Sequence, residues 1–163
     1  MSHIEQTAGT AADKPRYLED FEVGERWVSV PTLVTEGEIV AYGKANDPQK
    51  VHTDPEWAKT GPFGGLVASG WQIAALSMRV FVQSGGYGKT PVIGMGIDQL
   101  RWRKPVRAND TLTVEREVIE VLRSDSQPDR GTIRTQVSVR NQGGEVVMTL
   151  QTLGRVPARP PDF

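Results

Sequence analysis

One segment of the 163-residue chain carries the side chains best suited to acid–base chemistry: Asp47-Pro48-Gln49-Lys50-Val51-His52-Thr53-Asp54. A carboxylate beside an imidazole can hold one water molecule between them, and an imidazole with a pKa of about 6.5 exchanges protons near neutral pH. A partly desolvated carboxyl group can accept or return a proton. The spacing therefore predicts acid–base chemistry at Asp47 and His52. The competing interpretation is that both residues only stabilise a loop.

A second candidate is the glycine-bearing turn that leads into an apolar helical segment, Gly64-Gly65-Leu66-Val67-Ala68-Ser69-Gly70-Trp71. The first N–H groups of a helix have no internal partner and carry positive partial charge, so they can hold a developing oxyanion. Gly70 has no side chain, so a ligand carbonyl can approach its N–H closely. The alternative is that small residues here only let the helix begin close to a strand.

A third candidate is a basic stretch in which cations surround Trp102: Arg101, Arg103, Lys104 and Arg107. One interpretation is a patch that binds phosphate groups, with the tryptophan available for stacking. The other is an exposed strand whose long side chains lie over apolar surface. The composition leaves both open.

Composition excludes several other classes of protein. Lys and Arg number 19 and Asp and Glu number 20, so the near-neutral net charge of −1 does not favour binding of nucleic acid or an anionic membrane. With no cysteine, the chain has no disulfides, thiolate nucleophile or thiolate metal site. A metal site at His52 and Asp54 would have too few ligands, and Asp54 followed by Pro55 is instead a helix N-cap signal. We expect neither a metal nor a cofactor.

The order of the expected elements indicates one α+β domain. A strand over 26–30 precedes a helix capped at Thr35, a short helix over 56–59 and a long apolar helix over 68–83. Four strands follow, over 92–103, 112–122, 132–140 and 145–156. Short polar turns predict that successive strands are antiparallel neighbours. The helix over 68–83 is apolar almost all the way round, so we expect it to be buried against the sheet.

The ends of the chain are expected to be tails, over 1–16 and 157–163, on either side of a domain over 17–156. The first segment lacks the apolar centre of a signal peptide. No stretch reaches the roughly 18 apolar residues of a membrane span. We therefore expect a cytoplasmic protein.

Taken together, these features resemble the MaoC-like dehydratases, a hot-dog-fold group that includes (R)-specific enoyl-CoA hydratases. The family motif is Asp-x-Asn-Pro-x-His-x-Asp, followed by a Phe-containing segment and by His-Gly at the start of the long helix. Asp47, His52 and Asp54 stand at the same spacing here, and Phe63 and Gly70 lie at matching distances. The order of one helix followed by a meander also agrees.

This sequence departs from the family motif at four positions while keeping the acid–histidine pair. Gln49 stands in place of the asparagine, the proline has moved to Pro48, and Lys50 occupies the family's proline position. Ser69 replaces the histidine before the helix glycine. The likeness extends over residues 17–156.

The resemblance implies a hot-dog fold, with a long helix wrapped by a curved antiparallel sheet, and a hydro-lyase acting on a 2-enoyl-CoA or 3-hydroxyacyl-CoA thioester. It assigns water activation to Asp47 and His52 and the thioester oxyanion to the Gly70 N–H. It also implies a homodimer or higher homo-oligomer. The residues expected to bind substrate are Gln49, Phe63, Ser69, Trp71, Arg101, Arg103 and Lys104.

Two other functions compete with this one. A hot-dog acyl-CoA thioesterase is disfavoured because many carry a catalytic carboxylate on the central helix, and no Asp or Glu occurs between Leu66 and Val82. A non-catalytic acyl-CoA-binding module would bind the thioester without turnover. The acyl chain, the choice between CoA and an acyl carrier protein, and the direction of the reaction stay open.

Overall fold

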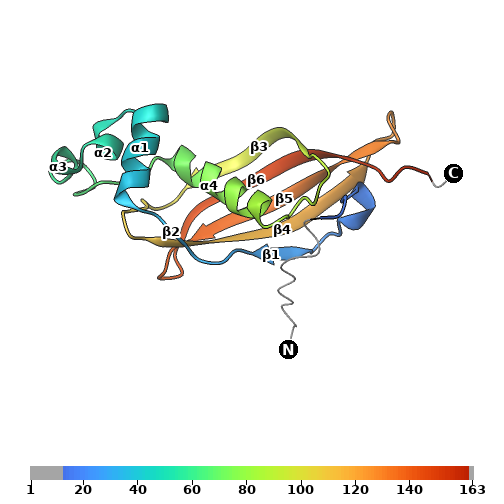
Figure 1. Cartoon of the computed structure of the whole chain (residues 1–163), viewed down its shortest axis with the longest axis horizontal. Helices are drawn as coiled ribbons and strands as arrows, with labels where there is room; N and C mark the ends of the chain where they lie inside the picture. The colour runs from blue at the N-terminus through green and yellow to red at the C-terminus, as the bar shows by residue number, and fades with distance from the viewer. Residues whose placement is uncertain (1–12, 162–163) are drawn as a thin grey trace.

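An antiparallel sheet and a long helix across one of its faces make up most of the molecule (Figure 1). The computed structural model describes residues 13–161. The elements in chain order are η1 (Leu18–Asp20), β1 (Arg26–Val28), β2 (Thr32–Leu33), α1 (Glu36–Asn46), α2 (Lys50–Thr53), α3 (Pro55–Ala58), α4 (Gly70–Gln83), β3 (Ile93–Trp102), β4 (Thr111–Arg123), β5 (Arg130–Arg140) and β6 (Val146–Pro157). This is the α+β hot-dog architecture that the sequence predicts.

The core lies between α4 and the inner face of the sheet. Strands β4 and β5 alternate between buried and partly exposed residues, as strands with one covered face do. Their inward aliphatic side chains pack with those of α4 in one cluster. Representative members are Leu112, Val114, Val137, Ile73 and Leu76. The periodicity of two in the strands and the long apolar helix therefore determine this layer together.

The expected pairing of each late strand with the next one is wrong for β3. The sheet order is β1-β4-β5-β6-β3, so β3 pairs with β6 rather than with β4. The connection after β3 is not a hairpin turn, because it crosses to the start of α4, where the Ala68 N–H donates to the Val106 carbonyl over 2.8 Å. This crossing places β3 at one edge of the sheet.

The helices before α4 follow the expected caps, with one addition. Thr35 and Glu38 form the capping box of α1, and Asp54 accepts a hydrogen bond from the Trp57 N–H at the start of α3. The segment around His52, which we expected to be a loop, forms the one-turn helix α2. A single turn is too short to show a hydrophobic period in the sequence.

Helix α4 begins at Gly70, two residues later than expected, and it is not buried on all sides. Trp71, Met78 and Val82 are 53%, 37% and 51% exposed. The sequence shows that every side of the helix is apolar. In a single copy of the chain, however, only the side that faces the sheet is covered.

The described chain makes contacts with the domain beyond the expected domain limits. Pro15 bridges to Gly88, and the Arg16 N–H donates to Thr90 Oγ1, so the segment 13–16 is held against the domain. At the other end, the Ala158 N–H donates to the Asp129 carbonyl. The rest of the expected tails, over 1–12 and 162–163, lies outside the described residues. Among residues 13–161, no helix has the length and apolar character needed to cross a membrane.

Candidate active site

Three short pieces of chain meet at the beginning of α4. Asp47 is the C-cap of α1, His52 lies on α2, and Ser69 is the residue before the first turn of α4. Figure 1 shows α1, α2 and α3 gathered beyond this end of α4. The pair predicted from sequence spacing is therefore assembled against the helix N-terminus that was predicted separately.

Hydrogen bonding fixes the His52 ring in one orientation. Its Nδ1 lies 2.7 Å from the Val67 carbonyl oxygen, and because a carbonyl can only accept, the Nδ1–H is the donor. The neutral ring therefore carries its lone pair on Nε2. That nitrogen lies 3.3 Å from Asp47 Oδ2, and His52 as a whole is only 8% exposed.

Two side chains hold the Asp47 carboxylate. Gln49 Nε2 donates to Oδ1 over 2.8 Å, and the Ser69 hydroxyl donates to Oδ2 over 2.7 Å. The hydrogen bond from Gln49, followed by that from Ser69, lowers the pKa of Asp47 below its ordinary value, against a smaller opposing effect of burial. Asp47 is therefore ionised at neutral pH.

When the His52 ring is neutral, its Nε2 and the Asp47 carboxylate are both acceptors, and Nε2 lies 3.3 Å from Oδ2. Neither can donate to the other, and both can accept the protons of a single water molecule. The geometry suits removal of a proton from that water by Nε2, with the adjacent carboxylate stabilising the imidazolium that forms.

The first turn of α4 leaves N–H groups available beside this pair. The N–H groups of Gln72 and Ile73 donate to the Ser69 carbonyl, whereas within residues 13–161 those of Gly70 and Trp71 donate to no protein acceptor. The Ser69 side chain makes no capping hydrogen bond to them, and its hydroxyl donates instead to Asp47. These free donors are the arrangement that an oxyanion needs.

Gly70 is required by a close approach as well. A Cβ added there would lie 2.3 Å from Trp102 Cε2, so the indole lies directly against the glycine. Trp102 also packs edge-on against Trp71, with ring centroids 5.2 Å apart. Any larger residue at this position would displace Trp102.

The structure places the expected substrate-binding residues in different environments. Gln49 and Ser69 contact Asp47 and so act on the carboxylate. Phe63 is 43% exposed, and its carbonyl accepts a hydrogen bond from Arg107. Lys104 forms an ion pair with Glu145. None of these contacts identifies a substrate by itself.

Arg101 and Arg103 are not brought to Asp47 and His52. Strand residues alternate between faces, and while Trp102 points toward Gly70, its two neighbours open onto a polar groove of about 260 Å³ on the outer face of the sheet. Neither arginine is paired with a carboxylate of the described residues. Two guanidinium groups without a carboxylate partner among the described residues therefore share this groove, and Arg101 donates to the Leu100 carbonyl and Arg103 to the Thr149 hydroxyl.

Sequence reasoning missed three contributors to the site. The Val67 carbonyl that orients His52 is a backbone group and leaves no mark in the sequence. Trp102 was considered for stacking on a ligand, not as the cover of Gly70. Gln72 is 9% exposed with no hydrogen-bond partner for Oε1, and its spacing of three from Ser69 resembles a capping box that the structure does not form.

The residues described hold no arrangement suited to a metal ion. Within 13–161 there is no group of three or more His, Cys, Asp or Glu side chains placed to share one. Asp54, the acid nearest to His52 in sequence, is occupied as the N-cap of α3.

Comparisons with known proteins agree with the fold. A sequence profile of the MaoC-like domain family matches residues 20–141. The protein YdeM of Bacillus subtilis is 32% identical over 77% of this chain and 87% of its own length. A 3-hydroxybutyryl-CoA dehydratase of Methylorubrum extorquens is 29% identical over 88% of this chain and 85% of its own length.

A solved structure extends the likeness to three dimensions. The crystal structure of a MaoC-like dehydratase from Rhodospirillum rubrum is 40% identical, with a TM-score of 0.82 over 90% of this chain and 99% of that one. Profile, relatives and structure agree with one another along nearly the whole domain. The chain belongs to the MaoC-like domain family.

Proposed function

We propose that this protein is a hydro-lyase that adds water to a 2-enoyl thioester or removes it from a 3-hydroxyacyl thioester. The observation that carries the proposal is the approach of His52 Nε2 to Asp47 Oδ2 over 3.3 Å. The family and its dehydratase relatives support the same reaction class.

In the hydration direction, one water molecule donates its protons to Nε2 and to Oδ2. Its oxygen attacks C3 of the enoyl group as Nε2 removes a proton, and the electron pair of the C2–C3 double bond moves toward the thioester carbonyl. The imidazolium then returns that proton to C2. Water is thereby added across the double bond with no net gain or loss of protons by His52, and Asp47 stabilises the cationic ring throughout.

Negative charge collects on the thioester oxygen during this step. The free N–H groups of Gly70 and Trp71, at the positive end of α4, are the donors we assign to it. The close packing of Trp102 on Gly70 keeps the backbone there in one position. We also propose that Arg101 and Arg103 bind the phosphate groups of a CoA carrier in their groove.

We further propose that the protein functions as a homodimer. Strand β3 is an edge of the sheet, and its side chains Ile93, Met95 and Ile97 are 60%, 45% and 50% exposed. A ten-residue apolar edge strand is a template for pairing with another chain. The exposed side of α4 is also apolar. In a symmetric dimer, the β3 edge of a second copy can cover it.

Isosteric replacement of the pair tests the function. Asp47→Asn and His52→Gln are each expected to lower kcat/KM for hydration of crotonyl-CoA by at least about a hundredfold, the scale of one general acid–base group. Loss of the enoyl absorbance measures the rate. Asp54→Asn is the matched control, because asparagine also caps helices well and this variant should keep wild-type activity. Wild-type rates in both site variants would refute the assignment.

The same assay separates the rival thioesterase. Release of free CoA thiol from saturated and unsaturated acyl-CoA alike, with no consumption of the double bond, would identify that activity instead. Within the described chain, α4 carries no carboxylate to support it.

A further inference from the structure

Strand β3 contains one residue in an unusual backbone conformation. Gln99 has a φ of 51°, in the left-handed region that residues with a side chain rarely adopt. It lies in a β-bulge: Asp98 pairs with Gln151 of β6 and Arg101 pairs with Thr149, so three steps along β3 match two along β6. Backbone strain of this kind is found most often at ligand sites.

The extra residue reverses the face of the sheet to which each following side chain of β3 points. Residues that pair across strands point to the same face. Trp102 therefore lies on the inner face with its buried partner Met148, and Arg101 lies on the outer face with Thr149. Without the bulge, the alternation from the outward Asp98 would place the arginine inside and the tryptophan outside.

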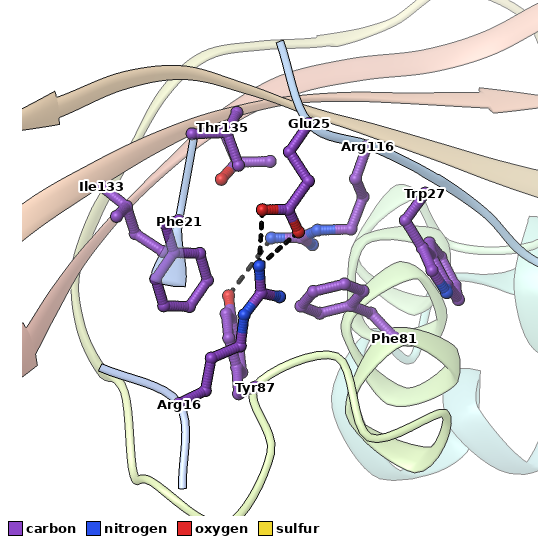
Figure 2. A pocket seen from close by; sticks show the side chains of 10 residues that line it. Arg16, Phe21, Glu25, Trp27, Phe81, Tyr87, Arg116, Ile133 and Thr135 are labelled. Carbon is purple, nitrogen blue, oxygen red and sulfur yellow. Dashed lines mark hydrogen bonds and ion pairs between the residues drawn. The ribbon is translucent and has the colours of Figure 1, made fainter. Parts of the chain in front are cut away.

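The outer face leaves an arginine accessible, whereas the inner face of this sheet buries it. Arg116, an inward residue of β4, is 3% exposed, and Figure 2 shows its guanidinium beside the rings of Phe81 and Tyr87. Arg101 and Arg103 are both exposed on the outer face. The bulge therefore keeps these two charges available to a ligand.

The groove that these arginines share is lined by polar residues, and Gln99, Gln136 and Thr149 complete it. Each guanidinium makes one hydrogen bond to another described residue. Because a guanidinium has five N–H donors, most of them stay available for phosphate oxygens.

The position of β3 at the edge of the sheet lets a ligand reach both faces of the strand. On the inner face, Trp102 lies against Gly70, whose N–H is assigned to the thioester oxygen. Its neighbours along the chain carry the outer cations. Even two packed sheets are only roughly 10 Å apart, and an extended pantetheine arm is longer than that. One CoA ligand can therefore occupy both faces at once.

We propose that Gln99 is a positioning residue of the thioester site. A CoA substrate crosses the edge of β3, with its thioester at Gly70 and its phosphate groups at Arg101 and Arg103. This inference rests on the proposed hydro-lyase function. It adds the route of the carrier and the bulge that makes this route possible.

Two crotonyl thioesters test the route. Crotonyl-N-acetylcysteamine has the same reacting atoms as crotonyl-CoA but lacks the nucleotide and its phosphates. Combining Arg101→Gln with Arg103→Gln should raise KM for crotonyl-CoA by at least about tenfold with little change in kcat, the scale of one charge-assisted contact. The same variant should hydrate the truncated thioester at the wild-type rate. Arg26→Gln, on the exposed β1, is the control and should affect neither substrate.

The outcomes separate the route from the reaction. Equal losses with both thioesters, or no loss with either, would overturn the route while wild-type hydration of the truncated thioester still supports the reaction. A wild-type protein that hydrates neither thioester would refute the reaction itself.

Substitutions at Gln99 test the bulge. Gln99→Gly allows positive φ without strain and should keep kcat/KM for both thioesters within about twofold. Gln99→Val puts a β-branched residue there, so the bulge must rearrange, and kcat/KM for both should fall by at least about tenfold. Asn109→Val is the matched control, because Asn109 also has a positive φ, of 70°, but lies in the turn before β4. This change should leave turnover of the folded protein unaltered.

Equal activity of the glycine and valine variants at position 99 would contradict the positioning role of the bulge. A tenfold loss in Gln99→Gly would be sufficient to overturn it, so the test does not depend on the folding of Gln99→Val.

Discussion

At the scale of single residues, the state of the Asp47 carboxylate depends on two neutral donors. Gln49 and Ser69 each bond to a different oxygen, and together they keep the group ionised and fix its plane next to Nε2. Serine at the start of a helix ordinarily caps it, yet here the hydroxyl is used for the carboxylate. The Ser69 side chain makes no capping hydrogen bond to the N–H groups at the start of α4.

Gln49→Leu should raise the pKa of the Asp47 carboxyl group, which NMR titration of its side-chain carboxyl carbon measures directly. The hydrogen bond from Gln49 is the largest contribution that lowers the pKa of Asp47, so its loss raises that pKa and the carboxylate becomes protonated earlier as pH falls. The hydration rate at neutral pH should change less than it does in Asp47→Asn.

Glu56→Gln, an exposed change on α3, provides the control for Gln49→Leu, and its Asp47 titration should match the wild type. An unchanged titration of Asp47 in Gln49→Leu would contradict the role given to the amide. The same linkage affects folding. Because the folded-state pKa of Asp47 is lowered, its contribution to stability is present above the ordinary carboxyl pKa and is lost as pH falls through the folded-state value.

At the scale of elements, the distance between α1 and α2 decides whether the pair meets. Gly43 lies in the last turns of α1, and a Cβ added there would lie 2.8 Å from the His52 carbonyl oxygen and 2.9 Å from its Cβ. The two helices can approach only because this position has no side chain. Asp47 ends one of them and His52 lies on the other.

Two glycines of α1 offer a matched comparison. Gly43→Ala should separate the helices, destabilise the fold by about 1–3 kcal/mol and lower turnover by about a hundredfold, since a small displacement of a catalytic group has a large effect. Gly37→Ala, in the first turn and with no atom within 4 Å of the added Cβ, should instead stabilise the fold by about 0.5–1 kcal/mol and leave turnover unchanged. Urea unfolding and the hydration assay measure both. Similar behaviour of the two variants would mean that the close contact does not matter.

At the scale of the whole molecule, the exposed apolar surface consists of the edge strand β3, which lies next to β6, and the exposed side of α4. A standard interface needs a contiguous area with apolar residues at its centre. The exposed residues of β3 and α4 supply apolar area, whereas the opposite edge of the sheet is occupied by the short β1 and β2 against β4.

Ile97→Lys should convert the proposed homodimer into a monomer, with a mass by light scattering equal to one 17.9-kDa chain. The residue is half exposed in one copy, so the charge should interrupt the pairing of two β3 edges without disturbing the core. Leu122→Lys, a similarly exposed apolar position near the end of β4, should leave the mass of a dimer. A monomeric wild type would remove the basis of this prediction.

The sequence by itself determined the features that depend only on residues close together along the chain. The capping box at Thr35, the cap at Asp54 and the alternation within β4 and β5 are local patterns, and each element forms where these patterns predict it. The spacing of Asp47 and His52 also identified the candidate pair, helped by the resemblance to a family whose motif contains both.

Only the tertiary structure decided which groups meet across long separations. It placed β3 beside β6, the Val67 carbonyl on His52 and Trp102 on Gly70. It also left Arg116 with free donors in the core. None of these contacts leaves a sign in the hydrophobic periodicity or in the turn residues of the sequence. Each depends on how separate elements pack against one another, and that packing is specified by the whole chain.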